Sequence, residues 1–124
     1  MAAPNLVAPT TINGKTVTVD LSTTSATSRL SNAASSGKVL KINALYVSNV
    51  DGTSAADITI NYYSAAALGG TATQIASTIS VPADATLVII DKDAYLYLEE
   101  NTSLGATAGT ASDLKIVCSY EDIS

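Results

Sequence analysis

The acidic side chains of the segment DKDAYLYLEE are the residues of this sequence best suited to chemistry. They are Asp91, Asp93, Glu99 and Glu100. Paired carboxylates can hydrolyse a glycoside, and several carboxylate oxygens together can hold Ca²⁺. Alternatively, the two aspartates form the turn after the apolar run LVII, and the two glutamates begin the next turn, because acidic residues are common at turns. No DxDxDG loop with a closing Glu is present, which favours the turn interpretation.

Other catalytic groups are scarce. The chain has no histidine, which excludes Ser-His-Asp and Cys-His sites. One cysteine without histidine cannot form a zinc cage, and neither a glycine-rich phosphate loop nor a GxSxG turn is present. A Ser-Lys pair stays open, although no spacing suggests one. Cys118 lies in the apolar run LKIVCSY, which predicts a buried thiol. We therefore predict a protein that is not an enzyme and that needs no cofactor or metal.

Six tyrosines are the only aromatic residues, because Phe and Trp are absent. Alternation along the chain places Tyr46, Tyr62 and Tyr120 on apolar faces, which predicts that they pack in the core. A sugar-binding surface would instead expose aromatic side chains. We expect at least one of the remaining three to lie exposed at an interface with a partner: Tyr63, Tyr95 and Tyr97.

Apolar residues recur with a period of two, which is typical of strands. In KTVTVDL, Val17, Val19 and Leu21 share one face. In KVLKINALYVSNV, one face carries Leu40, Ile42, Ala44, Tyr46 and Val50, and the other carries Val39, Leu45 and Val47. Apolar residues on both faces predict a central strand. The predicted strands span residues 15–21, 26–31, 38–50, 56–63, 73–81, 85–90, 94–98, 102–108 and 113–123.

Turn residues separate these strands. Asp51-Gly52 predicts a hairpin between strands 38–50 and 56–63, and Gly69-Gly70 predicts the next turn. Strands at such spacing, with no helical period, predict an all-β protein: an antiparallel β-sandwich, jelly-roll or Ig-like, of about eight strands. In TQIASTISV, the alternation places Ile75, Ser77, Ile79 and Val81 on one face.

The first residues are expected to form an extended arm. Residues 1–14 contain Pro4 and Pro9 and few charges, and Asn13-Gly14 predicts a turn at their end. The predicted organisation is an arm over 1–14 followed by a sandwich domain over 15–124. Leu6, Val7 and Ile12 would supply the arm's apolar contacts with a partner.

Charge and hydropathy limit the partners. The net charge is −5 and the basic residues are scattered, so nucleic acid and anionic membranes are unfavourable partners. Only 14% of residues are charged and the polar remainder is mostly Ser and Thr, which favours close packing against other protein surfaces. The start of the chain lacks the pattern of a secretory signal, and no apolar run is long enough to span a membrane.

The runs SNVDGTSAADITI, IASTISVPADATLVI and YLEE, and the ending SYEDIS, resemble a family of small virion structural proteins of tailed bacteriophages, notably marine cyanophages. The resemblance covers residues 38–124, and MAAPNLVAPTTINGKTV at the start is also similar. It implies a structural component of the virion, without fixing its place in the particle.

The expected function is a non-enzymatic decoration or cement protein on the phage head. It would bind the capsid surface as a homo-oligomer, for instance a trimer, and contact virion proteins such as the major capsid protein. One alternative is a structural component of the neck, tail or baseplate. A second is a carbohydrate-binding or host-adhesion module, because a sandwich fold suits all three.

Overall fold

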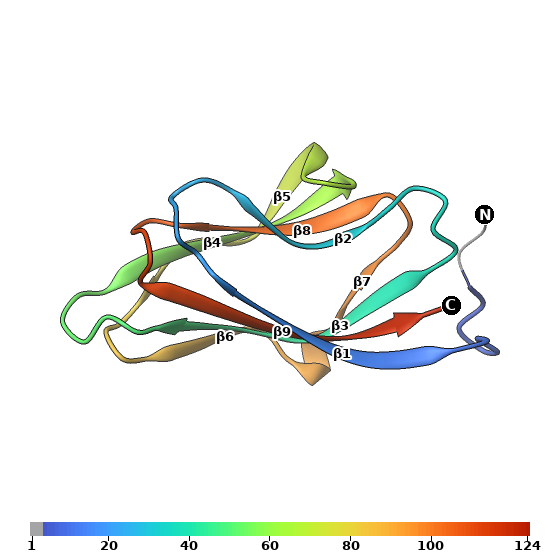
Figure 1. Cartoon of the computed structure of the whole chain (residues 1–124), viewed down its shortest axis with the longest axis horizontal. Helices are drawn as coiled ribbons and strands as arrows, with labels where there is room; N and C mark the ends of the chain where they lie inside the picture. Colours follow the sequence, from blue (N-terminus) through green and yellow to red (C-terminus); the bar gives the residue numbers. More distant parts are fainter. Residues whose placement is uncertain (1–3) are drawn as a thin grey trace.

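Two antiparallel sheets pack face to face to form a sandwich (Figure 1). The computed structural model describes residues 4–124, and within this range the chain forms nine strands and one 3-10 turn. They are β1 (Ile12–Asp20), β2 (Thr27–Asn32), β3 (Val39–Asn49), β4 (Ala56–Ala65), β5 (Gly69–Val81), β6 (Thr86–Ile90), η1 (Lys92–Ala94), β7 (Leu96–Leu98), β8 (Thr102–Ala108) and β9 (Leu114–Ile123). The prediction of an all-β sandwich is confirmed.

The strand order is that of a jelly roll. One sheet has the order β1-β9-β3-β6, with β7 also paired to β3, and the other has the order β2-β8-β4-β5. β6 and β7 both lie along β3 and share one position, so nine strands fill the eight positions of a jelly roll. The chain thus forms a long two-stranded antiparallel ribbon that is wrapped into two layers. The paired strands of this ribbon are β1 with β9, β2 with β8, β3 with β6 and β7, and β4 with β5.

The core lies between the sheets and is formed by alternate residues of the inner strands. On β3, Ile42, Leu45 and Val47 are fully buried. Burying each such side chain contributes roughly 1.5–3 kcal/mol. The other large side chains with almost no exposure are Leu21, Ile58, Ile60, Val81, Leu98, Leu104, Leu114, Ile116 and Cys118. The prediction that the thiol of Cys118 is buried is confirmed.

Bulges change which side chains face the core. The pairing of β3 with β9 shifts by one residue between Ile42 and Ala44. An extra residue in a strand moves every later side chain to the opposite face. Tyr46 is therefore 37% exposed, and the prediction that it shares the core face of Ile42 is wrong. Val50 is also exposed, contrary to the same prediction.

A similar shift occurs in β5. The register slips between Ile79, which pairs with Ile58, and Ala76, which pairs with Ile60. Thr78 between them has a φ of 49°. Ala76 is buried as a result and pairs with Ile60, so the prediction that Ile75 shares a face with Ile79 and Val81 is wrong. Ile75 and Ile79 are 41% and 40% exposed.

The hairpin predicted at Asp51-Gly52 does not form. The chain crosses from β3 in one sheet to β4 in the other, and Asn49 anchors the crossing by donating its Nδ2 hydrogens to the carbonyls of Ser54 and Val81, both at 2.9 Å. Asp51 closes a small turn there, since its Oδ1 accepts the backbone N–H and the hydroxyl of Thr53. A hairpin does join β4 to β5, but its turn is residues 66–68, and Gly69-Gly70 lies in the strand.

The N-terminal segment is shorter and more compact than expected. β1 begins at Ile12, so Asn13 and Gly14 lie inside a strand, paired with Asp122 and Glu121, and the predicted turn there is wrong. Residues 4–11 contain a turn at residues 6–7 rather than an extended arm. The segment ends beside the C-terminus, where the N–H groups of Thr10 and Thr11 donate to the carbonyl of Ser124 (Figure 1). Residues 1–3 of the predicted arm lie outside the described residues.

Candidate interaction surfaces

Two of the four acidic side chains in DKDAYLYLEE, those of Asp91 and Glu100, accept hydrogen bonds from backbone N–H groups. Oδ1 of Asp91 caps η1 by accepting the N–H groups of Asp93 and Ala94 at 3.0 and 2.9 Å. Oε2 of Glu100 accepts the N–H of Gly37 at 3.2 Å. These contacts agree with the turn interpretation. Among residues 4–124, no three His, Cys, Asp or Glu side chains are grouped so that they could hold a metal ion.

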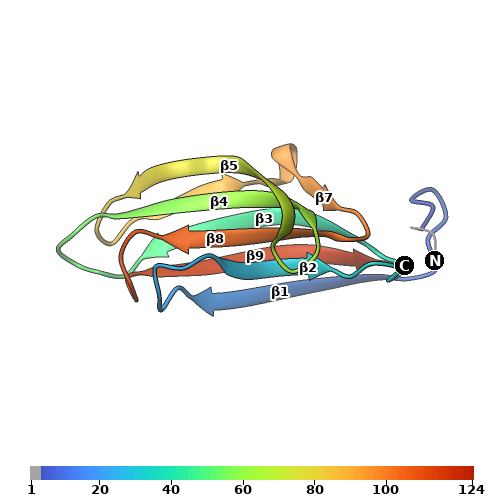
Figure 2. The same cartoon turned by 90° about the horizontal axis from the view of Figure 1, so that it is seen from above.

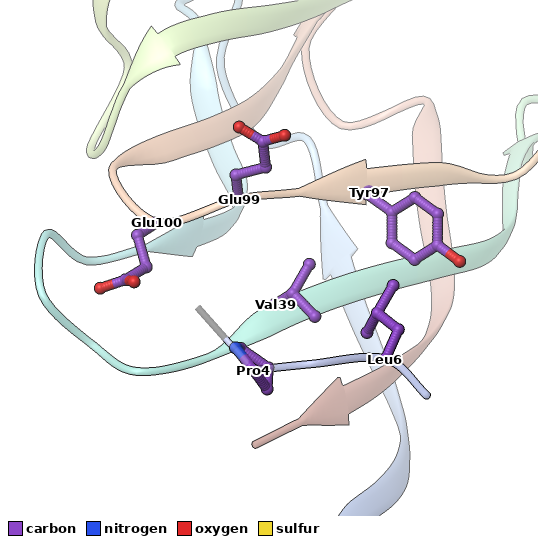
Figure 3. A pocket seen from close by; sticks show the side chains of 6 residues that line it. All are labelled: Pro4, Leu6, Val39, Tyr97, Glu99 and Glu100. Atoms are coloured by element: carbon purple, nitrogen blue, oxygen red, sulfur yellow. The ribbon is translucent and has the colours of Figure 1, made fainter. Parts of the chain in front are cut away.

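A cavity of about 380 Å³ opens at the end of the sandwich where the N-terminal segment packs (Figure 3). Figure 3 shows the apolar side chains of Leu6, Val39 and Tyr97 gathered there, with Glu99 and Glu100 on the strand end beyond them. The cavity thus combines an apolar wall with an acidic rim. It brings together two of the six predicted interface residues, Leu6 and Tyr97.

The other predicted interface residues are spread over the surface. Val7 is 92% exposed in the N-terminal turn, and Ile12 is exposed at the start of β1, where it pairs with Ile123. Tyr95 is about half exposed next to η1. Its ring lies edge-on to that of Tyr97, with centroids 5.4 Å apart. Nζ of Lys41 lies 4.5 Å from the centroid of Tyr95, a cation–π contact.

Tyr63 is only 9% exposed, so the expectation that it is available to a partner is wrong. The tip of the β4–β5 hairpin folds over the outer face of its own sheet, because the N–H of Leu68 donates to the hydroxyl of Ser103. A Cβ at Gly105 would lie 2.6 Å from Leu68 Cδ2 and 2.9 Å from Tyr63 Cε2. Gly105 therefore makes room for both side chains. Tyr62 and Tyr120 pack partly buried against the core, as predicted.

A further exposed surface, which the sequence patterns did not predict, lies along β5. We name this strand, Gly69–Val81, the neutral edge. β5 is the outermost strand of its sheet and is exposed along most of its length (Figure 2). It carries no charged residue, and residues 58–90 contain one, Asp84. Ile75 and Ile79 are its exposed apolar side chains. The charge-free window in the sequence is the signal that could have predicted this surface.

Comparisons with known proteins bear on the fold. No protein-family model and no curated protein matches the chain. A solved structure from the work "Bacillus endospore appendages form a novel family of disulfide-linked pili" is similar, with 17% identity and a TM-score of 0.53 over 92% of this chain and 88% of that chain. At this identity the similarity shows a shared fold alone.

Within residues 4–124, no helix has the length and apolar character needed to cross a membrane.

Proposed function

We propose that this protein is a non-enzymatic structural subunit of a bacteriophage virion, where it acts by packing its β-sandwich against other protein surfaces. The observation that carries the proposal is the neutral edge, an uncharged strand of 13 residues left exposed at the border of a sheet. An unpaired strand edge is a template for pairing with another chain, and proteins that stay monomeric blunt it with charges. The neutral edge of this chain carries no such charges.

The finer form of the proposal is a head decoration or cement protein that binds the capsid surface as a homo-oligomer. Its support is the sequence resemblance over residues 38–124 and the jelly roll, an architecture used by viral capsid domains. A solved structure from work on Bacillus endospore appendages that form disulfide-linked pili has a similar fold, which fits a role in assembly without pointing to a phage. A place in the neck, tail or baseplate is compatible with the same features.

Copy number tests this proposal. Quantitative mass spectrometry of purified phage particles should find the protein in hundreds of copies per particle if it decorates the head, and in a few dozen or fewer if it belongs to the neck or tail. Absence of the protein from particles that are otherwise complete would overturn the virion assignment.

The exposed ring of Tyr95 favours a second candidate, a carbohydrate-binding or adhesion module. An exposed tyrosine beside a second aromatic ring can stack on a sugar. A glycan array with the wild-type protein and Tyr95→Ala distinguishes the two, because only the second candidate predicts glycan binding that is lost in the variant. Tyr46→Ala is the matched control, since Tyr46 is also partly exposed but lies elsewhere on the sheet.

A further inference from the structure

The neutral edge has the features of a self-association surface rather than of a solvent-facing border. Within residues 4–124, β5 pairs with β4 on one side and with no strand on the other. Thirteen residues of strand extend roughly 40 Å, and the outer N–H and C=O groups of an edge strand are free to pair. Neither Lys nor Pro, two residues that protect an edge, occurs between Gly69 and Val81, so the bulges at Ile75 and Thr78 are the protective feature that this strand has.

Charge indicates which partner fits this edge. The chain carries a net charge of −5, yet β5 and the neighbouring β6 are uncharged. A nucleic acid, an anionic membrane or a strongly charged protein finds no opposite charge there. A second copy brings the same uncharged strand, so the edges meet without like-charge repulsion while the acidic groups stay apart.

We propose that β5 of one copy pairs antiparallel with β5 of a second copy about a two-fold axis, which joins two four-stranded sheets into one. This inference deepens the proposed function and rests on it. A two-fold contact uses the same patch on both subunits. The register of β5 with β4 shifts at Thr78 and again at Ile75, which lies unpaired between Ala76 and Gln74, so the paired run is centred on the regular residues 72–74 just before Ile75. Ile75, exposed and apolar, then lies at or next to the axis.

The size of the interface sets the expected strength. Pairing confined to one strand edge lies at the small end of protein interfaces. The dimer is therefore expected to depend on protein concentration, and to be completed by other contacts inside a particle. Sedimentation velocity of the full chain over a range of concentrations should show a shift from monomer to dimer.

A charge swap at Ile75 tests the inference. Ile75→Lys and Ile75→Glu each place like charges across the axis, so each variant should sediment as a folded monomer. An equimolar mixture should recover the dimer, because opposite charges then face each other. Thr16→Lys is the matched control on β1, the edge strand of the other sheet, and should keep the wild-type dimer.

Cysteine cross-linking tests the register. Thr73→Cys, Ile75→Cys and Ser77→Cys each add one thiol, and the native Cys118 is fully buried. On mild oxidation the disulfide dimer should form most at the position nearest the axis, and Thr16→Cys should form little. Cross-linking at Thr16→Cys as efficient as on β5, or a wild-type protein that stays monomeric at its highest soluble concentration, overturns the inference.

The two proposals fail in different ways. If Ile75→Lys and Ile75→Glu leave both dimerisation and particle incorporation unchanged, the neutral edge is not the contact, and the structural role stands. If the protein is missing from particles but dimerises through β5, the virion role fails and the contact stands.

Discussion

The two sides of the sandwich end in strands of opposite chemical character (Figure 2). On one side, β1 carries charges that are all paired with β9: Lys15 with Asp122 at 3.2 Å and Asp20 with Lys115 at 3.0 Å. On the other side, β5 and β6 are uncharged. Both sides leave strand edges exposed, so exposure alone does not distinguish them. The comparison predicts that charge, rather than exposure, decides which edge of this fold can pair with another chain.

Asp122 shows how the charged side is built. It is 7% exposed, and its Oδ2 accepts from Nζ of Lys15 and of Lys38, at 3.2 and 3.3 Å. The two lysines reach it from β1 and from the chain just before β3, while their side chains stay about half exposed. A nearly buried carboxylate held by two cations fixes β1 against β9 and keeps positive charge at this border.

The largest expected effect comes from the core that both edges share. Ile42→Asp would bury an unpaired carboxylate at a fully buried position and should prevent folding, a loss of about 5 kcal/mol or more. Tyr46→Asp on the same strand should fold, because the bulge after Ile42 turns Tyr46 outward. Circular dichroism and thermal melts compare the two variants. Unfolding of both would mean that Tyr46 faces the core, as simple alternation predicts.

Ile42 and Tyr46 also show which features of the fold can be predicted from the sequence and which cannot. Alternation of apolar residues located the strands and the sandwich, because the period of two is a local property. Bulges at β3 and β5 reversed the facing of Tyr46 and Ile75, and the sequence contains no local signal for them. The Asp51-Gly52 pair indicates a turn but not whether the next strand returns to the same sheet. Tyr63 is buried by the hairpin tip that carries Leu68, a contact between distant segments.

The second prediction tests whether the N-terminal segment or the neutral edge forms the contacts that assemble the protein. Deleting residues 2–9 keeps β1 and the bonds of Thr10 and Thr11 to Ser124. The shortened protein should remain folded, with a loss of about 1–2 kcal/mol from the contacts of Leu6. We expect it to dimerise through β5 but to join particles poorly if the segment contacts another virion protein. Light scattering and particle incorporation measure the two properties separately.

The third prediction removes the charges that distinguish the two sides. The double variant Lys15→Thr with Asp20→Thr makes β1 uncharged while keeping strand-forming residues. The fold should persist, because Lys38 still pairs with the nearly buried Asp122 and the exposed pair of Asp20 with Lys115 contributes only about 0.2–1 kcal/mol. The variant should form species larger than the dimer, because a second edge becomes open to pairing. Ser22→Thr, in the loop after β1, is the control. Unchanged sedimentation of the double variant would show that charge does not protect β1.

The smallest expected effect concerns the crossing between β3 and β4, which connects the two sheets. The backbone N–H of Thr53, together with its hydroxyl, holds the pKa of Asp51 below its ordinary value of 3.8. A lowered pKa means that the charged form is favoured in the folded protein. The stabilisation is therefore complete at pH values above 3.8 and is lost as the pH falls through the lower, folded-state pKa.

Asp51→Ala removes these bonds without touching the core or either edge. Its melting temperature should lie slightly below that of the wild type at pH 7, and the gap should narrow as the pH is lowered below 3.8. Dimerisation measured by sedimentation should stay unchanged. A gap that is independent of pH would assign the effect to the turn's backbone rather than to the carboxylate. Loss of the dimer in Asp51→Ala would mean that pairing through β5 depends on the conformation of the crossing as well as on charge.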